Sequence, residues 1–272
     1  MTDHYAVIGN PIAHSLSPQI HAAFAVQTHQ AMEYTRILGK IDDFASDVRQ
    51  FIAAGGRGMN VTVPFKEQAW RLLEDVSPRA ATAQAVNTLI VHDGGLLHGD
   101  NTDGVGLVRD LAHNHGFVFA GRRVLLLGAG GAARGVLKPL LDTGIAHLAI
   151  ANRTPEKAVQ LATIGANFGS VSGGGFDQLT GQRFDLILNA TASGLSDSVP
   201  PLHADCLNDG GWVYDLFYGQ QPSAFCRWGH TQGAARVLDG LGMLVEQAAE
   251  SFQLWRGLRP ETAPVIAALR AG

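Results

Sequence analysis

The sequence predicts an α/β protein made of two domains, each containing a parallel sheet. Short apolar segments alternate with helical ones along most of the chain, a pattern typical of βαβ units. Many of the 33 glycines stand where those apolar segments end, and 272 residues exceed one average domain. We expect one domain over residues 1–103, completed by 240–272, and a second domain over 104–239.

The first domain is expected to alternate short strands with helices. Strands are predicted at 5–8, 36–38, 58–63 and 85–91, and helices at 18–28, 41–54 and 64–73. Ser17 is the predicted N-cap of the first helix, because Pro18 after it suits the first helical position. Asp93-Gly94-Gly95 predicts a hairpin turn after the last strand.

The second domain shows a tighter alternation. Strands are predicted at 123–127, 147–151, 184–189, 212–217 and 235–238, with a helix at 131–143. Residues 241–256 predict a long helix, because their apolar positions recur at helical spacing, and this helix can return to the first domain. Gly173–Gly175 is interpreted as a short linker.

Composition and charge exclude several classes of protein. Hydrophobic residues make up 46% of the chain and charged residues 16%, which argues against intrinsic disorder. The net charge of −4 provides no basic field for nucleic acid or an anionic membrane, so we expect neither as a partner. Without a signal peptide or an apolar run of membrane-spanning length, we expect a cytoplasmic protein.

The cysteine and histidine patterns predict no metal site. Cys206 and Cys226 form no CxxC pair, and a disulfide between them is not excluded. The 11 histidines include no HExxH or HxH pattern, the spacings typical of metal ligands.

A glycine-rich turn predicts a dinucleotide site in the second domain. Gly128, Gly130 and Ala133 match G-x-G-x-x-G/A directly after a predicted strand and at the start of a helix. The first glycine allows the tight turn, the second lets the backbone approach a pyrophosphate, and the alanine allows close packing of helix and strand. The alternative is a glycine-rich turn in an α/β domain that binds no nucleotide.

The end of the next strand favours NADP over NAD. NAD-binding domains usually place an acidic residue there to bind the ribose hydroxyls. Here Asn152, Arg153, Thr154 and Lys157 stand at this position, and all four can donate hydrogen bonds to a 2′-phosphate. The alternative for Arg153 is a solvated surface charge.

Three segments of the first domain carry polar side chains suited to chemistry. Ser15 and Ser17 flank the start of a predicted helix, and Lys66 falls in the first turn of another. The helix dipole disfavours a cation there, so such a lysine gives up its proton readily unless a carboxylate opposes it, which suits acid–base chemistry. Asp103 is the predicted N-cap of a helix over 105–113 and also a candidate catalytic partner.

These motifs resemble, in order and spacing, the shikimate dehydrogenases of aromatic amino-acid biosynthesis. The resemblance runs from Gly9 to about Pro264 through GNPIAHSLSP, NVTVPFK, AVNT, GDNTDG, GAGGAAR, NRT, NATASG and DGLGMLVEQAAESF. It implies a substrate-binding α/β domain, a Rossmann domain that binds NADP, and C-terminal helices that return to the first domain. The implied reaction is the reversible NADPH-dependent reduction of 3-dehydroshikimate to shikimate.

The resemblance also implies roles for individual residues. Lys66 is the implied catalytic acid–base, paired with Asp103. Together with these two, the implied substrate-binding residues are Ser15, Ser17, Thr62, Asn87, Tyr218 and Gln247. The implied cofactor-binding residues are Gly128, Ala129, Gly130, Gly131, Ala132, Asn152, Arg153, Thr154, Lys157, Thr191, Leu216, Gly240 and Met243. Lys157 stands where relatives often have arginine, so the preference for NADP is expected to be less steep.

Three other functions are weighed against this one. A quinate/shikimate dehydrogenase with relaxed cofactor use would share Lys66 and Asp103, but the site around Arg153 argues against NAD. A methylenetetrahydrofolate dehydrogenase has a similar two-domain plan but lacks the serine pair. A non-catalytic ligand sensor on this fold should have lost Lys66 or Asp103. No pattern in the sequence indicates the oligomeric state. A homodimer is the assembly that stays open beside a monomer.

Overall fold

The computed structural model describes residues 2–191 and 198–271, which divide into two compact units. The first unit contains the chain up to Gly106 and from Leu244 onward, and the second contains Leu107–Met243. No helix in the described part of the chain is long and apolar enough to cross a membrane. Across residues 2–191 and 198–271, no three His, Cys, Asp or Glu side chains group as metal ligands would.

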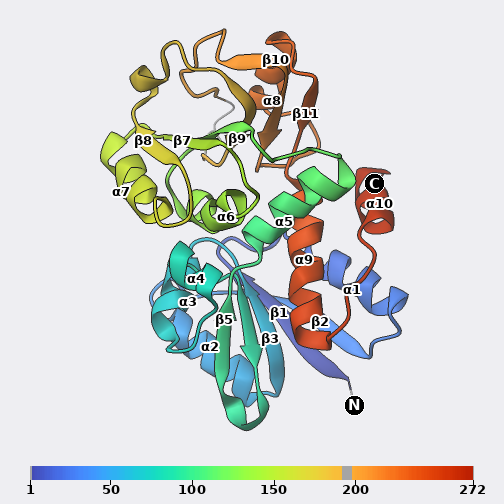
Figure 1. Cartoon of the computed structure of the whole chain (residues 1–272). Coiled ribbons are helices and arrows are strands. Elements are labelled where there is room, and N and C mark those ends of the chain that lie inside the picture. Colours follow the sequence, from blue (N-terminus) through green and yellow to red (C-terminus); the bar gives the residue numbers. More distant parts are fainter. Residues whose placement is uncertain (1, 192–197, 272) are drawn as a thin grey trace. The chain divides into compact units, whose positions relative to one another are not determined.

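The first unit contains a mixed sheet (Figure 1). Its strands are β1 (Asp3–Gly9), β2 (Met32–Leu38), β3 (Gly56–Val61), β4 (Thr88–Val91) and β5 (Leu97–Asp100), in the order β2-β1-β3-β4-β5. β1, β2 and β3 are parallel, as expected, whereas β4 and β5 run antiparallel. The predicted turn is confirmed, because Asp93–Gly95 form a short 3₁₀ helix between β4 and β5. A hairpin this short forces its two strands to be antiparallel, so this sheet is only partly parallel.

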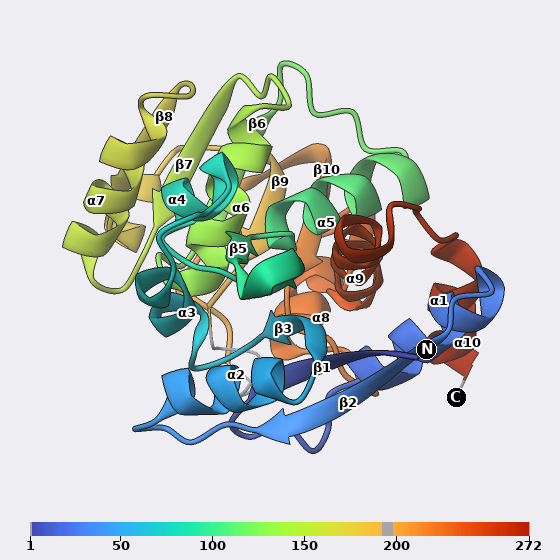
Figure 2. The ribbon, with the colours of Figure 1, turned by 90° about the horizontal axis from the view of Figure 1, so that it is seen from below.

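Helices cover both faces of this sheet. They are α1 (Ser17–Gln27), α2 (Phe44–Ala53), α3 (Lys66–Leu72), α4 (Pro78–Ala83), α9 (Leu241–Arg256) and α10 (Ala263–Ala271). Apolar side chains of α1, α9 and α10 form one buried cluster, and those of α2, α3 and α4 pack with the strands in another. Figure 2 shows α1, α9 and α10 together on one side of the unit and α2 along the sheet. The C-terminal helices are therefore part of the first unit, although they are far from it in sequence.

The second unit contains a six-stranded sheet in which every strand pair is parallel. The strands are β6 (Arg123–Leu127), β7 (His147–Ala151), β8 (Val171–Gly174), β9 (Phe184–Asn189), β10 (Leu207–Asp215) and β11 (Arg236–Leu238), in the order β11-β10-β9-β6-β7-β8. The central strands are continuous apolar runs because helices cover both of their faces. Chain order reverses between β6 and β9, the place where doubly wound sheets bind ligands.

Helices of the second unit lie on opposite faces of its sheet. α6 (Gly131–Leu141) and α7 (Pro155–Gly165) contribute to one apolar cluster, and α8 (Ala224–Thr231) contributes to the other. α5 (Asp103–Arg109) continues into a π-helical turn, Asp110–Asn114. Both boundaries between the units lie inside helices, one in α5 and one in α9.

The interpretation of Gly173–Gly175 as a linker was wrong for its first two residues. Gly173 and Gly174 belong to strand β8, which pairs with β7. A Cβ at Gly173 would lie 2.2 Å from the backbone oxygen of Ala158 in α7, so only glycine permits this close approach of helix and strand.

Candidate active site

Lys66 and Asp103 form a direct ion pair in the first unit. Lys66 Nζ donates to Asp103 Oδ2 across 2.6 Å. Each residue begins a short helix, Lys66 in α3 and Asp103 in α5, and only 22% and 9% of the two side chains are exposed. The carboxylate therefore opposes the cation that the dipole of α3 disfavours, and keeps a proton donor at a partly open position.

Neighbouring side chains hold Asp103 in place. Its Oδ1 accepts a hydrogen bond from Asn87 Nδ2 (2.7 Å), and its backbone N–H donates to Asn101 Oδ1 (3.1 Å). Because α5 begins at Asp103 itself, the prediction that Asp103 is an N-cap was wrong, and the Asn101 side chain satisfies this backbone donor instead. The Asp103 carboxylate is thereby left available for Lys66.

Asn87 and Gln247 lie in the same buried cluster. Asn87 Oδ1 accepts from the backbone N–H of Thr102 (2.9 Å), which sets the orientation of the amide, and Asn87 Nδ2 lies 3.3 Å from Gln247 Oε1. Gln247 comes from α9, so the C-terminal helix contributes directly to this cluster. Four of the implied substrate residues, Lys66, Asn87, Asp103 and Gln247, are therefore in contact in the structure.

An ion pair that sequence reasoning missed anchors the segment between β5 and α5. Arg79 donates to both carboxylate oxygens of Asp100 at 2.7 Å, and Ser77 also donates to Asp100. Burial alone would raise the pKa of Asp100, but the hydrogen bonds and charge of Arg79 outweigh it and the pKa lies below its usual value. The available signal was Ser77 before Pro78, a helix start that Ser77 caps.

The remaining polar candidates of the first unit lie outside this cluster. Ser15 Oγ accepts from the backbone N–H of Ser17 (3.3 Å), so Ser15 supports the helix start. The prediction that Ser17 is the N-cap was wrong, because α1 begins at Ser17 and Leu16 occupies the cap position. Thr62 is half-buried just after β3. Within the described residues, none of these three side chains hydrogen-bonds to Lys66 or Asp103.

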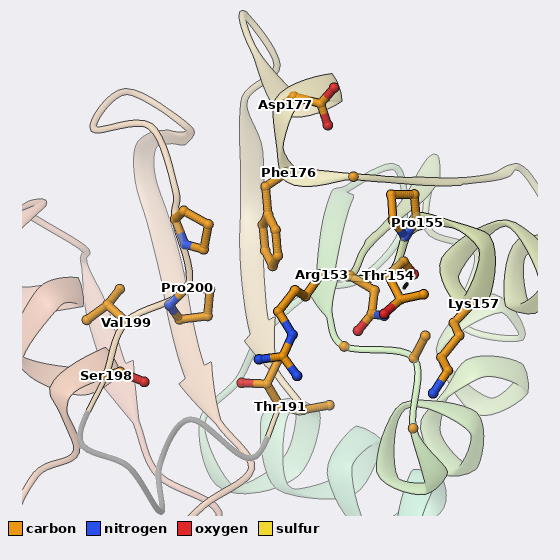
Figure 3. Close-up of a pocket in the computed structure, with 17 residues that line it drawn as sticks. Arg153, Thr154, Pro155, Lys157, Phe176, Asp177, Thr191, Ser198, Val199 and Pro200 are labelled. Atoms are coloured by element: carbon orange, nitrogen blue, oxygen red, sulfur yellow. Dashed lines mark hydrogen bonds between the residues drawn. The ribbon is translucent and has the colours of Figure 1, made fainter.

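The glycine-rich turn of the second unit borders a cavity of about 790 Å³ (Figure 3). Gly128, Ala129 and Gly130 line it between the end of β6 and the start of α6. Gly128 has φ +103°, and a Cβ there would lie 3.0 Å from Ala190 O, so the turn requires glycine. A Cβ on Gly130 or Gly131 would meet no atom within 4 Å, which leaves room for a ligand against the helix N-terminus.

The polar side chains predicted to read a 2′-phosphate line the same cavity. Asn152, Arg153, Thr154 and Lys157 surround its edge, and Figure 3 shows Arg153 and Lys157 extending into the space between them. Asp177 also lines the cavity but points away from both cations. A nucleotide carrying an extra phosphate fits this donor set, because among the described residues of the lining two cations and no inward-pointing carboxylate face it. Phe176 and Pro155 line the cavity too, although no sequence pattern singled them out.

The other implied cofactor and substrate residues of the second unit fall into two groups. Thr191 lines the cavity and donates to Asn189 Oδ1, whereas Ala132, Leu216, Tyr218, Gly240 and Met243 do not line it. A Cβ on Gly240 would lie 2.1 Å from Leu216 O, so those two loops approach closely. Burial raises the pKa of the half-buried Tyr218. Residues 192–194 of the NATASG motif lie outside the described residues.

Comparison with known families covers both units. Residues 7–89 match the shikimate dehydrogenase substrate binding domain, and residues 110–195 match shikimate / quinate 5-dehydrogenase. Residues 240–270 match the shikimate 5′-dehydrogenase C-terminal domain. The three matches follow one another along the chain and include Lys66, Asn87 and Gln247 but not Asp103.

Similar proteins extend over the full length of the chain. Shikimate dehydrogenase (NADP(+)) of Nitrosococcus oceani is 56% identical over 270 residues, which are 99% of this chain and 96% of that protein. The crystal structure of an Ael1 enzyme from Pseudomonas putida is 47% identical, with a TM-score of 0.93 over 98% of each chain. The structure of shikimate 5-dehydrogenase from Thermus thermophilus in complex with NADP(H) and shikimate is 33% identical, with a TM-score of 0.88 over 99% of each chain. The chain therefore belongs to the shikimate dehydrogenase family.

Proposed function

We propose that this protein catalyses the reversible NADPH-dependent reduction of 3-dehydroshikimate to shikimate, a step of aromatic amino-acid biosynthesis. The observation that carries the proposal is the 2.6 Å contact of Lys66 with Asp103 inside a buried polar cluster. The NADP-dependent shikimate dehydrogenases that match the whole chain support the same reaction. We assign substrate binding to the first unit and NADP binding to the second.

Lys66 transfers the proton of the reaction, and Asp103 supports Lys66. NADPH, when bound, supplies the hydride, so the protein must provide one proton and orient the reactants. In the reductive direction Lys66 Nζ donates that proton to the carbonyl oxygen of the substrate as it becomes an alkoxide. The Asp103 carboxylate stabilises the ammonium before transfer and holds Nζ in position. In the oxidative direction the lysine amine accepts the proton from the shikimate hydroxyl.

The other polar residues of the first unit supply recognition of the substrate. We assign Ser15 and Ser17 to its carboxylate, because both lie at the N-terminus of α1, where anions are favoured. Thr62, Asn87, Asp103 and Gln247 are assigned to ring hydroxyls, which can both donate and accept hydrogen bonds. Tyr218 of the second unit is assigned to the substrate by family resemblance alone.

The second unit supplies the residues for NADP. The N-terminus of α6, with Gly128–Ala132, is assigned to the pyrophosphate, and Asn152–Lys157 are assigned to the 2′-phosphate. Arg153 offers a fork of donors and Lys157 a point charge, so Arg153 should discriminate more strongly between NADP and NAD. Thr191, Leu216, Gly240 and Met243 are assigned to the remainder of the cofactor.

A quinate/shikimate dehydrogenase activity with relaxed cofactor use is the second candidate function. Residues 110–195 match a family described as acting on shikimate or quinate, and Lys157 provides no fork-shaped phosphate contact. A pocket of hydroxyl donors accepts or rejects quinate according to sub-ångström placement of those donors.

The rate of cofactor reduction tests both candidates in one experiment. The purified protein is assayed with shikimate or quinate, each combined with NADP or NAD. Activity largely confined to shikimate with NADP is the expected result. Comparable rates with quinate or NAD would favour the second candidate, and no activity in any pairing would refute both.

We also assign the protein to the cytoplasm, where a biosynthetic NADPH-dependent reaction has access to its cofactor. We propose that it assembles as a homodimer. Sedimentation equilibrium at micromolar concentration, giving the monomer mass alone, would refute that assembly.

A further inference from the structure

A buried network of hydrogen bonds is linked to the Lys66–Asp103 pair through Asn87. It contains residues to which no role has been assigned. Its members are Asn60 on β3, Thr88 on β4 and Ser251 on α9. Asn60 is 6% exposed, and the hydroxyl-bearing residues Thr88 and Ser251 are fully buried. Buried polar groups almost always have hydrogen-bond partners. The sequence of donors and acceptors in this network therefore shows how each side chain is oriented.

The orientation of Asn60 follows from its neighbours. Asn60 Nδ2 lies 3.2 Å from the backbone oxygen of Asn87, which can only accept, so this end of the amide is the donor. Tyr34 donates its hydroxyl proton to the opposite end, Asn60 Oδ1, across 2.7 Å. The second Nδ2 hydrogen faces two hydroxyl oxygens, that of Ser251 at 3.0 Å and that of Thr88 at 3.2 Å, and both accept from it.

The Thr88 hydroxyl is hydrogen-bonded to Asn87. Asn87 Oδ1 can only accept, so the Thr88 hydroxyl 2.8 Å away donates its proton to it. Ser251 Oγ lies 2.8 Å from the same hydroxyl and 3.1 Å from the backbone oxygen of Gln247, and its single proton is shared between these two acceptors. Asn87 Oδ1 thus accepts from Thr88 and from the backbone N–H of Thr102, and the Thr102 hydroxyl lies 3.2 Å from it.

The orientation of Asn87 decides what faces Asp103. With its oxygen held by Thr88 and Thr102, the Asn87 amide presents Nδ2 to Asp103 Oδ1 at 2.7 Å. If the amide turned over, its oxygen would face the carboxylate, and two acceptors cannot form a hydrogen bond. The Asp103 carboxylate would then lose a donor and shift relative to Lys66.

We propose that Thr88 is a positioning residue for the reaction, and that its hydroxyl orients Asn87 so that Asp103 holds Lys66 in its productive place. This inference rests on the proposed function, because it assigns Thr88 to the acid–base pair. Thr88 reaches Asp103 and Lys66 through Asn87, so its removal should reduce the rate of turnover more than the binding of either ligand.

Thr88→Val tests the proposal, because valine keeps the shape of threonine and removes only the hydroxyl. We expect kcat for shikimate oxidation to fall about tenfold, the effect of one lost hydrogen bond at a catalytic pair. The KM for shikimate should change less than kcat, and the KM for NADP should not change. Thr88→Ser, which restores the hydroxyl, should recover most of the lost kcat.

Two controls separate positioning from folding. Thr82→Val removes the exposed hydroxyl of α4 that bonds Pro78 O, and we expect it to keep the original kcat. Thermal unfolding of each variant shows whether it is folded at the assay temperature. If Thr88→Val does not fold, Thr88→Ala removes the same hydroxyl without burying a methyl group against polar atoms.

The outcomes distinguish this inference from the proposed function. An unchanged kcat in Thr88→Val, or equal losses in Thr88→Val and Thr88→Ser, would overturn the role of the hydroxyl while leaving the proposed function standing. An inactive unmodified protein would instead refute the proposed function. A tenfold loss that Thr88→Ser restores would support both.

Discussion

The two units differ in how their functional side chains are held before any ligand binds. In the first unit Lys66, Asp103 and Asn87 are largely buried and hydrogen-bonded to one another. In the second unit Arg153 and Lys157 are exposed, and neither side chain has an ion pair or hydrogen bond within the described residues. One site is ordered by side chains, and the other by the backbone path of a glycine-rich turn.

This difference predicts two kinds of response to mutation. Residues that share one hydrogen-bonded cluster act as a unit, so the effects of removing them do not add. Residues that approach a ligand separately should contribute separately, and their effects should add. The first unit is therefore expected to show strong coupling between substitutions, and the nucleotide cavity little.

The largest effect is expected at the ion pair. Lys66→Ala should lower kcat by ~10²–10⁴, the usual range for loss of a general acid–base, with little change in the KM for shikimate. Combining Lys66→Ala with Asp103→Asn should lower kcat no further, because the carboxylate acts through the lysine. Steady-state kinetics of the two single variants and the double variant measure this coupling.

Arg71→Ala is the matched control for Lys66→Ala. Arg71 is an exposed cation in the same helix, 3.8 Å from Glu67, and its removal should leave kcat unchanged. Full activity of Lys66→Ala would remove the lysine from its assigned role. Multiplicative losses in the double variant would show that the pair does not act as a unit.

A second effect concerns stability in acid and arises from His21 in the core of the first unit. His21 is fully buried, stacks on Tyr34 with ring centroids 4.2 Å apart, and has no hydrogen-bond partner for either ring nitrogen among the described residues. Burial lowers its pKa from 6.5 to about 3. Between pH 6.5 and about pH 3, His21 binds a proton in the unfolded chain but not in the folded protein. The free energy of unfolding therefore falls as the pH falls.

Replacing His21 with phenylalanine should remove this sensitivity. From pH 7.5 to pH 5 the unmodified protein should lose about 2 kcal/mol more unfolding free energy than His21→Phe, at about 1.4 kcal/mol per pH unit below 6.5. Guanidinium chloride unfolding at several pH values measures the difference, with the exposed His230→Gln in the second unit as the control. Parallel pH dependences for His21→Phe and the unmodified protein would contradict the expectation.

In the sheet of the second unit, the sequence predicted the central strands better than the edge strand β8. β6, β7 and β9, and the long helix α9, have the expected bounds, because continuous apolar runs and helical periodicity mark buried elements directly. β8 was missed because Gly173 and Gly174 carry no apolar signal. Glycine is required there by the backbone of α7, a tertiary contact that no local pattern reveals.

The candidate site was predicted to a different depth in each unit. The glycine-rich turn and the cations after β7 form continuous motifs, so their place beside one cavity could be expected from sequence. Asn60, Thr88 and Ser251 are far apart in the chain and resemble ordinary polar residues. Their role follows only from the three-dimensional order of donors and acceptors, which local sequence does not encode.

The last effects are expected at the nucleotide cavity, where the loss of Lys157 should be the smallest, and they test whether the residues of the cavity act independently. Arg153→Ala should weaken NADP binding by roughly 1–3 kcal/mol, the value of charge-assisted hydrogen bonds, and leave NAD binding nearly unchanged. Lys157→Ala should weaken NADP binding less, because an exposed ammonium gives a screened point charge without a fork of donors. Titration calorimetry of NADP and NAD with both single variants and the double variant measures these values.

The two losses should add, because the side chains of Arg153 and Lys157 share no hydrogen bond in the described structure. Equal weakening of NADP and NAD by Arg153→Ala would show that Arg153 does not contact the 2′-phosphate. Strong coupling between Arg153 and Lys157 would show that the nucleotide site, like the ion-paired cluster of the first unit, is organised by its side chains.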